Sequence, residues 1–302
     1  MKAVQFAEYG DPDVLRVTEV PEPHAGAGQI RIRVRAAGVN PIDWKVRSGM
    51  MAQGTALDAP RGLGSDVAGV VDEVGGGVTG VSTGAEVFGF AASPGYAESA
   101  LMEHFAAKPA GMSWAEAAGL PVVVETAVRC LDLLGVKAGQ TILVNGAAGG
   151  VGIAATQFAR ARGASVIGTA SESNHEFLRS LGATPVTYGA GLVERVRVLV
   201  PHGVDLALDT AGRGAIPDLV ELAGSPDNVI TIADFTAGQY GVRVTGGQEG
   251  RAYHALGLAA QLYEENRFVM PVAQTLPLEQ AAEAHRLSQD GHVRGKLVLT
   301  VD

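Results

Sequence analysis

A short apolar run, a glycine-rich turn and a second apolar stretch follow one another directly between Thr141 and Arg162. Residues 141–144 have the composition of a buried strand, and residues 150–162 have that of a helix ending at Gly163. A strand that feeds a helix through a glycine turn is the opening unit of a parallel sheet wound with helices. The segment therefore predicts an α/β domain.

Three positions in this turn match the glycine pattern of dinucleotide-binding sites, with one departure. They fall on Ala147, Gly149 and Gly152, so alanine replaces the first glycine. Gly149 lets the backbone approach a pyrophosphate, and Gly152 lets the helix pack closely on the strand. The helix N-terminus adds free N–H donors and the positive end of the helix dipole. Because a strand precedes the turn and a helix follows it, we interpret it as nucleotide-binding rather than as an ordinary tight turn.

The end of the next predicted strand bears on which nucleotide is bound. An acidic residue roughly 20 residues beyond the glycines would hold the ribose hydroxyls of NAD. Residues 168–171 read GTAS and contain no acid, although Glu172 follows and argues for NAD. The sequence favours NADPH over NADH, because several donors are available to a 2′-phosphate: Ser171, Ser173, Asn174, His175 and Arg179.

The rest of the chain separates into a β-rich beginning, an alternating middle and a short β-rich return. Strands expected at residues 30–36, 67–74, 84–90 and 96–101, separated by glycine turns, predict a mostly antiparallel sandwich or partial barrel. A capping-box pattern at Ser113 and Glu116 opens an alanine-rich helix. From residue 140 strands and helices alternate, as in a doubly wound parallel sheet. We expect domain boundaries at 118/119 and 267/268, giving residues 1–118, 119–267 and 268–302.

Composition and charge exclude several classes of protein. The 302 residues carry a net charge of −9 and no basic stripe, so nucleic acid is not an expected partner. The N-terminus has no apolar signal region, and polar residues interrupt residues 142–159, so we expect a cytoplasmic protein without a membrane span. One cysteine, Cys130, excludes an internal disulfide and is expected to be a small buried apolar residue. The seven histidines are scattered singly, so no metal is expected.

Several motifs, taken in order, resemble those of a known family. They read AGVNPID at 37–43, GSDVAGV at 64–70, GYAE at 95–98, AAGLP at 117–121, ETA at 125–127, NGAAGGVG at 145–152, DTAG at 209–212 and GHVRGKLVL at 291–299. This order is similar to that of the zinc-independent quinone oxidoreductases of the medium-chain dehydrogenase/reductase superfamily, relatives of zeta-crystallin. The resemblance implies a GroES-like domain formed by both chain ends, a Rossmann domain between them and a substrate cleft between the domains.

The resemblance also implies where the site residues lie. Asn40, Asp43 and Thr126 would lie near a nicotinamide, and His175 and Tyr188 near the adenosine phosphate. Zinc-dependent relatives carry cysteine or histidine where this chain has Asn40, and Gly-His-Glu where it has Gly64-Ser65-Asp66, which implies chemistry without metal. The remaining cofactor contacts are expected from Ala148, Gly149, Gly150, Val151, Thr169, Ser171, Ala211 and Lys296.

Without a Lewis acid the expected chemistry is hydride transfer between correctly positioned partners. Quinones and conjugated enones suit it, because delocalisation spreads the developing charge and a single hydrogen-bond donor stabilises it. Asn40 and Lys45 are candidate donors, with a turn residue and an exposed lysine as the alternatives. Asp43 is expected to fix its loop by local hydrogen bonds rather than to act as a base.

The leading prediction is an NADPH-dependent reductase of quinones or similar activated acceptors, homodimeric by analogy with the family. The first alternative is an enoyl or alkenal reductase, and the second is a non-catalytic NADPH-binding protein. Residues 50–60 are expected to form a mobile loop that influences substrate choice. Four aromatic residues are candidates either for an apolar slot that takes a flat ring or for core packing: Trp44, Phe90, Tyr96 and Tyr240.

Overall fold

The computed structural model describes residues 1–52, 54–247 and 250–301, which form two compact units. The first unit contains Met1–Val122 and Leu256–Asp302, and the second contains Val123–Ala255. Both chain ends therefore share one unit. The division falls at 122/123 and 255/256, against the predicted 118/119 and 267/268. The second boundary differs because helix α8 (Ala255–Glu264) packs on the first unit, where the Tyr263 hydroxyl donates to the Gly111 carbonyl at 3.1 Å.

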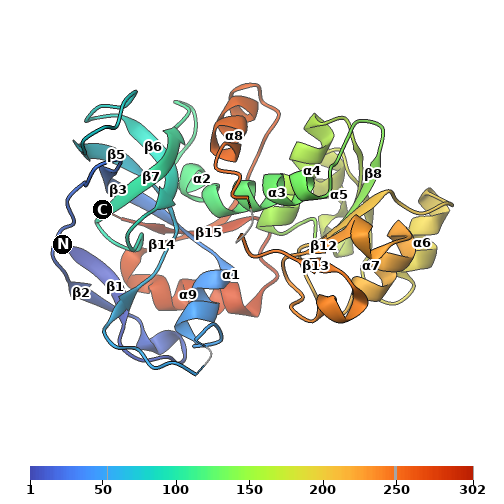
Figure 1. Ribbon diagram of the computed structural model, residues 1–302, viewed down its shortest axis with the longest axis horizontal. Coiled ribbons are helices and arrows are strands. Elements are labelled where there is room, and N and C mark those ends of the chain that lie inside the picture. The colour runs from blue at the N-terminus through green and yellow to red at the C-terminus, as the bar shows by residue number, and fades with distance from the viewer. Residues whose placement is uncertain (53, 248–249, 302) are drawn as a thin grey trace. The chain divides into compact units, whose positions relative to one another are not determined.

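The first unit is built around a six-stranded sheet in the order β14-β15-β3-β5-β6-β7. All neighbouring pairs are antiparallel except β14 and β15, and β3 also pairs with β7, so four strands close on themselves. This confirms the mostly antiparallel domain (Figure 1). The strands are β3 (Ile30–Val39), β5 (Asp66–Val74), β6 (Glu86–Ala91), β7 (Ser99–Ala107), β14 (Val272–Pro277) and β15 (Lys296–Thr300).

Within the described residues, a second, three-stranded sheet and three helices besides α8 complete this unit. The sheet has the order β2-β1-β4 and consists of β1 (Lys2–Phe6), β2 (Arg16–Glu19) and β4 (Arg61–Gly62). The helices are α1 (Pro41–Arg47), α2 (Trp114–Ala118) and α9 (Ala281–Asp290). In β3 the side chains of Ile30, Ile32 and Val34 are buried, and the intervening arginines are not, as the alternation predicts.

The second unit contains a six-stranded sheet in which every neighbouring pair is parallel, in the order β10-β9-β8-β11-β12-β13. Counted from β8, this is the order 3-2-1-4-5-6 of a doubly wound dinucleotide-binding domain, with its reversal between β8 and β11. Ligands bind such sheets at the carboxyl ends of the strands beside that reversal. The strands are β8 (Thr141–Asn145), β9 (Ser165–Thr169), β10 (Thr184–Val186), β11 (Leu206–Asp209), β12 (Val229–Thr231) and β13 (Arg243–Val244).

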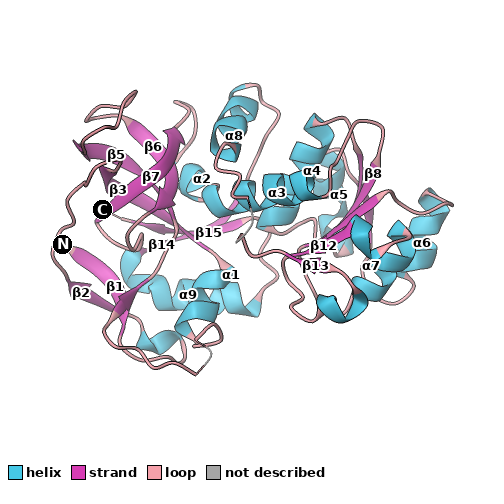
Figure 2. Ribbon diagram, in the orientation of Figure 1, coloured by secondary structure: helices cyan, strands magenta, loops and turns pink. Residues whose placement is uncertain are grey.

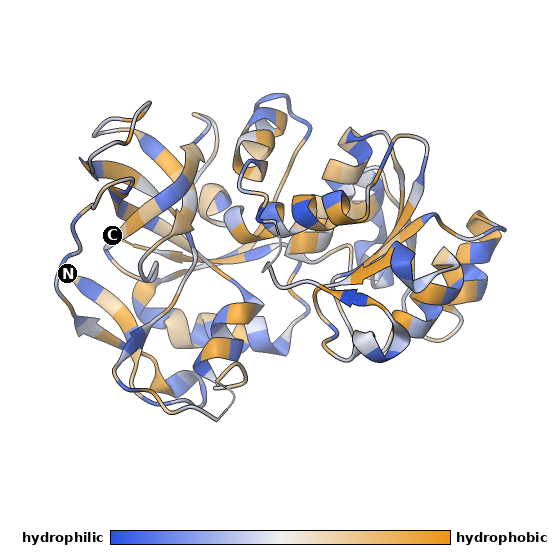
Figure 3. Cartoon of the chain, viewed as in Figure 1, coloured by the Kyte–Doolittle hydropathy of each residue, from blue (hydrophilic) through white to orange (hydrophobic). Residues whose placement is uncertain are grey.

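Helices cover this sheet (Figure 2). They are α3 (Pro121–Leu133), α4 (Gly150–Ala161), α5 (His175–Ser180), α6 (Leu192–Leu199) and α7 (Ile216–Ala223). Helices α6 and α7 carry both hydrophobic and hydrophilic residues (Figure 3), and their buried side chains Val196 and Leu219 join strand residues such as Leu143 in one core. Burying these apolar side chains is the main source of stability of the layered arrangement.

The structure confirms the alanine-rich helix that opens at Ser113. Its capping box is present, since the Glu116 N–H donates to the Ser113 hydroxyl and the Ser113 N–H to the Glu116 carboxylate. Helix α2 ends at Ala118, and Pro121 begins a new helix, α3. Proline is accepted in a first helical turn and interrupts a longer helix, because it has no N–H to donate.

Cys130 is fully buried in α3, as predicted.

Among the helices of the described ranges, none combines the length and the apolar character needed to cross a lipid bilayer. In the loop of residues 50–60, residue 53 lies outside the described residues.

His285 of α9 is completely buried beside Tyr96, with 5.9 Å between the ring centroids. Neither ring nitrogen has a hydrogen-bond partner among the described residues. Burial, assisted by the nearby Arg47 cation, lowers the pKa of His285 from 6.5 to about 3. The folded protein therefore holds this imidazole in its neutral form.

We expect acid to destabilise the protein in part through this histidine. The unfolded chain binds its proton near pH 6.5, so the contribution of neutral His285 is complete above that pH. It is lost as the pH falls from 6.5 toward 3, by at most ~1.4 kcal/mol per pH unit. Urea unfolding between pH 7 and 4 should show a smaller loss of stability for His285→Phe than for the wild type. The exposed control His202→Phe should match the wild type, and equal pH dependence in all three would contradict the prediction.

Candidate functional site: a nucleotide turn and a buried polar cluster

The turn between β8 and α4 explains the alanine in the glycine pattern. Gly146 adopts a left-handed conformation with φ +81°, a region that favours glycine. A Cβ on Gly146 would also lie 2.8 Å from the Thr210 hydroxyl oxygen. Ala147 has no positive φ, so alanine is tolerated there. The residue that requires glycine for the turn is thus one position earlier than the sequence pattern indicated.

The other two glycines have different environments. A Cβ on Gly152 would lie 2.3 Å from the Gly146 carbonyl oxygen and 2.6 Å from the Ala147 Cα, both main-chain atoms. Gly152 therefore permits the close approach of helix and strand, as predicted. Gly149 is the N-cap of α4, and a Cβ there would meet no atom closer than the Gly146 carbonyl oxygen at 3.5 Å. Among the described residues, the space beside Gly149 is therefore open.

Alanine at these two positions should separate packing from ligand binding. Gly152→Ala forces main-chain atoms apart, so we expect a loss of about 1–3 kcal/mol of unfolding free energy. Gly149→Ala keeps an ordinary φ of −81° and should lower stability by no more than about 1 kcal/mol, because alanine is a poorer N-cap than glycine. The added methyl should nevertheless weaken nucleotide binding at least tenfold. Thermal unfolding and titration with NADPH measure the two effects, and unimpaired binding by Gly149→Ala would contradict a phosphate position beside it.

A row of buried polar side chains crosses the carboxyl ends of four adjacent strands. The Thr169 hydroxyl of β9 donates to the Asn145 side-chain oxygen of β8 at 2.6 Å. The Asn145 amide donates to Asp209 of β11 at 2.8 Å, and the Thr231 hydroxyl of β12 donates to the other Asp209 oxygen at 2.7 Å. Thr169 also accepts from the Gly146 N–H at 3.0 Å. These bonds preorganise the glycine turn.

Sequence reasoning did not single out Asn145, Asp209 and Thr231 as site residues. Their signal is that each is a polar residue at the end of an otherwise apolar strand. Parallel strands present such ends at one edge of the sheet. The structure brings several predicted cofactor residues to this same edge: Ala148, Gly149, Gly150, Val151, Thr169 and Ala211.

The predicted 2′-phosphate donors follow β9. The Asn174 amide donates to the Ser171 hydroxyl at 3.0 Å, and the hydroxyls of Ser171 and Ser173 are 3.0 Å apart. The Nε2 atom of His175 is buried and has no hydrogen-bond partner within the described part of the chain. Glu172 is exposed, and Tyr188, after β10, is 48% exposed. An anionic acceptor here would satisfy the orphan nitrogen of His175.

A second polar site lies in the first unit, around the N-terminus of α1. Asn40 is the N-cap, and its N–H donates to the Asp43 carboxylate at 2.8 Å, which confirms that Asp43 fixes its loop locally. The Tyr96 hydroxyl donates to the same Asp43 oxygen at 2.7 Å. The Asn40 amide donates to Asp66 at 2.8 Å. The Lys296 ammonium donates to the Asn40 side-chain oxygen at 2.5 Å and lies 3.7 Å from Asp66.

Burial dominates the electrostatics of this cluster. It raises the pKa of Asp43 and of Asp66 to about 6, against the opposing hydrogen bonds and the Lys296 charge. Burial also raises the pKa of Tyr96 well above its usual 10, so its hydroxyl keeps its proton and donates. It lowers the pKa of Lys296, which the two carboxylates oppose. With both carboxylates ionised, the cluster carries one more negative charge than positive charge.

The structure also places three further residues of the first unit. Tyr96 is completely buried with its hydroxyl on Asp43, which agrees with core packing, one of its two predicted roles. Lys296, a predicted cofactor contact, donates to the Val39 carbonyl and the Asn40 side-chain oxygen within the Asn40 cluster. The Lys45 ammonium lies 5.7 Å from the centre of the Trp44 ring, and partial burial lowers its pKa.

The residues around Asn40 do not fit a zinc site. The Asn40 side-chain oxygen accepts from an ammonium, and the Asp66 oxygens accept from the Asn40 amide and the Val122 N–H. Tetrahedral zinc needs thiolate, imidazole or carboxylate ligands gathered together. Here the internal cation near Asp66 is Lys296 itself.

Removal of the Lys296 ammonium should lower the free energy of unfolding. Lys296→Met leaves Asp66 buried without its counter-charge, so we expect a loss of about 3–5 kcal/mol of unfolding free energy at neutral pH. The double variant Lys296→Met/Asp66→Asn should recover at least half of it, because residue 40 is then free to turn its amide and accept from the new amide. Urea unfolding of both variants tests this, and no recovery in the double variant would contradict the ion-pair account.

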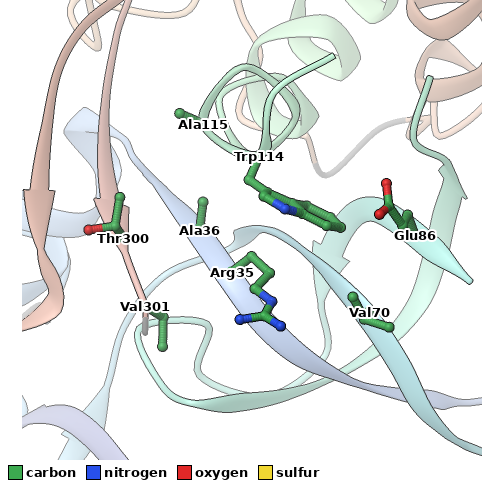
Figure 4. Close-up of a pocket in the computed structure, with 8 residues that line it drawn as sticks. All are labelled: Arg35, Ala36, Val70, Glu86, Trp114, Ala115, Thr300 and Val301. Atoms are coloured by element: carbon green, nitrogen blue, oxygen red, sulfur yellow. The ribbon is translucent and has the colours of Figure 1, made fainter. Parts of the chain in front are cut away.

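A hollow of about 510 Å³ lies elsewhere in the first unit (Figure 4). The Trp114 ring forms part of its wall, and the Lys108 ammonium lies 4.8 Å from the centre of that ring. None of the predicted site residues lines it. Its lining residues are Arg35, Ala36, Val70, Glu86, Trp114, Ala115, Thr300 and Val301.

Comparison with known proteins identifies the class. Residues 26–159 match the family model of the alcohol dehydrogenase GroES-like domain, and residues 181–299 match that of zinc-binding dehydrogenases. The chain is 31% identical to a quinone oxidoreductase of Rattus norvegicus, covering 99% of this chain and 97% of the relative. It is 33% identical to a 2-methylene-furan-3-one reductase of Solanum lycopersicum, covering 99% of this chain and 79% of the relative.

Comparison with solved structures points to the same class of protein as the sequence matches. A quinone oxidoreductase from Coxiella burnetii superposes with a TM-score of 0.84 at 32% identity, covering 100% of this chain and 99% of that one. An NAD-dependent alcohol dehydrogenase superposes with a TM-score of 0.87 at 31% sequence identity. A mycobacterial protein solved with NADPH superposes with a TM-score of 0.81 at 28% identity, and both comparisons cover 100% of each chain. The chain belongs to the quinone oxidoreductase family of the medium-chain dehydrogenases/reductases, and its second unit is the nicotinamide-nucleotide domain of that family.

Proposed function

We propose that this protein is an NADPH-dependent oxidoreductase that transfers hydride to a quinone or a similarly activated acceptor without metal. The observation that carries the proposal is the preorganised glycine turn at the sheet reversal, in a chain of the quinone oxidoreductase family. The intact turn also argues against a purely structural protein. Homodimer formation remains a prediction from the family.

The residues present fit the proposed cofactor. The N–H groups at the start of α4, from Gly149, Gly150 and Val151, would bind the pyrophosphate. Ser171 and the orphan Nε2 of His175 would bind the 2′-phosphate, with Tyr188 nearby in the same half of the sheet. When bound, the reduced nicotinamide supplies the hydride.

On the acceptor side, the first unit supplies hydrogen-bond donors and a rigid loop. We assign Lys45 as the donor to the developing oxyanion, because its ammonium is partly buried and strengthens such a bond. Asn40 and Asp43 act by holding the start of α1, since both are buried and bonded to other groups of the cluster. Lys296 supplies the positive charge that this loop requires.

A second candidate function is saturation of a conjugated carbon–carbon double bond. It is favoured by the relative from Solanum lycopersicum, whose name is 2-methylene-furan-3-one reductase. The chemistry is closely similar, since hydride adds to the β-carbon of an enone and the oxygen of the resulting enolate needs the same donor. The two candidates differ only in the acceptor and its product.

The direct test is consumption of NADPH and of NADH against a panel of quinones, alkenals and 2-enones, with analysis of the products. We expect kcat/KM to be at least tenfold higher with NADPH than with NADH, and quinones to be reduced to quinols. Consumption with NADH alone would refute the 2′-phosphate site. Loss of a carbon–carbon double bond would establish the second candidate.

The same assay should include two histidine variants. His175→Ala removes a phosphate donor, so KM for NADPH should rise about tenfold while KM for NADH stays unchanged. The exposed control His202→Ala should leave both values unchanged.

A further inference from the structure

One buried carboxylate in the second unit, that of Glu125, accepts five hydrogen bonds from four residues. Glu125 of α3 has no exposed surface. Its Oε1 accepts from the Arg129 Nε at 2.8 Å and from the Ala252 N–H at 3.2 Å. Its Oε2 accepts from the Arg129 Nη2 at 3.3 Å, the Arg251 Nη1 at 3.4 Å and the Thr126 hydroxyl at 3.4 Å.

Arg129 extends the contact to the edge strand of the sheet. Its guanidinium is also buried, and Nη1 donates to the Thr245 hydroxyl at 2.6 Å. Thr245 directly follows β13, and its N–H donates to the Thr231 carbonyl at 3.0 Å. The Glu125–Arg129 pair therefore holds two parts of the chain on α3. Arg129 bonds Thr245 at the end of β13, and Glu125 accepts from the Arg251 guanidinium and the Ala252 N–H.

A buried ion pair is weak evidence for stability, because well-packed apolar side chains of similar volume often stabilise as much. A buried ion pair also fixes the orientation of the side chains that it joins, because each of its hydrogen bonds is directional. Glu125 and Arg129 both bond to the hydroxyl of Thr126, which fixes the position of that oxygen from two sides.

The location of these bonds connects them with the nucleotide. In doubly wound sheets each half binds one nucleoside, at the carboxyl ends of its strands. The glycine turn belongs to the half made by β8, β9 and β10. Thr245 and Thr231 end strands of the other half, which would take the nicotinamide.

We propose that Glu125 is a positioning residue for the nicotinamide half of the nucleotide site. Through Arg129 and the Ala252 N–H it fixes the Thr126 hydroxyl and, after β13, the residues Thr245 and Ala252. This inference rests on the proposed function, and it assigns a role to a residue that need not touch the cofactor.

The test compares Glu125→Gln with a matched control. The substitution keeps the shape but removes the charge and places an N–H₂ group against donors. We expect kcat with a quinone to fall at least tenfold, whereas the Kd for 2′-phospho-ADP-ribose, which lacks nicotinamide, changes less than twofold. Glu221→Gln, which breaks the exposed Arg197–Glu221 pair of the same unit, should leave both values unchanged.

A parallel loss of kcat, of 2′-phospho-ADP-ribose affinity and of melting temperature would mean a merely structural role and overturn the proposal. Unchanged kcat would overturn it as well. If Glu125→Gln fails to fold, the Arg251→Gln variant tests the proposal instead, because it removes only a partly exposed donor to Glu125. In Arg251→Gln, a threefold or larger fall in kcat with unchanged 2′-phospho-ADP-ribose affinity supports the proposal, and any other result overturns it.

Binding separates this inference from the proposed function. A wild-type protein that binds NADPH but reduces no acceptor would refute the reductase. The ratio of Kd for 2′-phospho-ADP-ribose to Kd for NADPH would still report the nicotinamide contribution. A fall of that ratio in Glu125→Gln would support the positioning role, and an unchanged ratio would contradict it.

Discussion

Asp209 is the group on which the nucleotide edge of the second unit depends. Its carboxylate has no exposed surface, so its oxygens must find donors inside the protein. Its donors are Asn145 of β8, Thr231 of β12 and the N–H groups of Ala211 and Gly212, so they come from the two strands beside β11 and from the turn that follows it. A buried carboxylate left without donors is costly, so the strand ends are held in one register.

The first unit relies on the same physics with a different composition. Asp43 and Asp66 are buried next to Lys296, and burial raises both carboxyl pKa values toward neutrality. The ammonium offsets part of that cost and also bonds Asn40 at the start of α1. Both units therefore build a rigid polar site from buried carboxylates whose donors come from several elements. Such sites suit hydride transfer, in which the protein mainly supplies orientation.

Much of this was accessible from the sequence because the signals are local. Periodicity and glycine placement predicted the strand–turn–helix unit around Gly149 closely, with the strand at 141–144 and the helix at 150–162 against Thr141–Asn145 and Gly150–Ala161. The capping box at Ser113 and the local role of Asp43 also depend on residues three positions apart. The helix that opens at Ser113 is short, because Pro121 starts a second helix directly after it.

The class of fold, the nucleotide turn and the family were predictable from the sequence, because these depend on neighbouring residues and on the order of motifs. Which distant residues share a site depends on the tertiary structure. Lys296 reaches Asn40 because β15 pairs with β3, across 256 positions of sequence. Glu125 meets Ala252 across 127 positions, and Asp209 meets Asn145 across 64. Such partners follow from strand order and helix packing, which bring together groups that no local pattern connects.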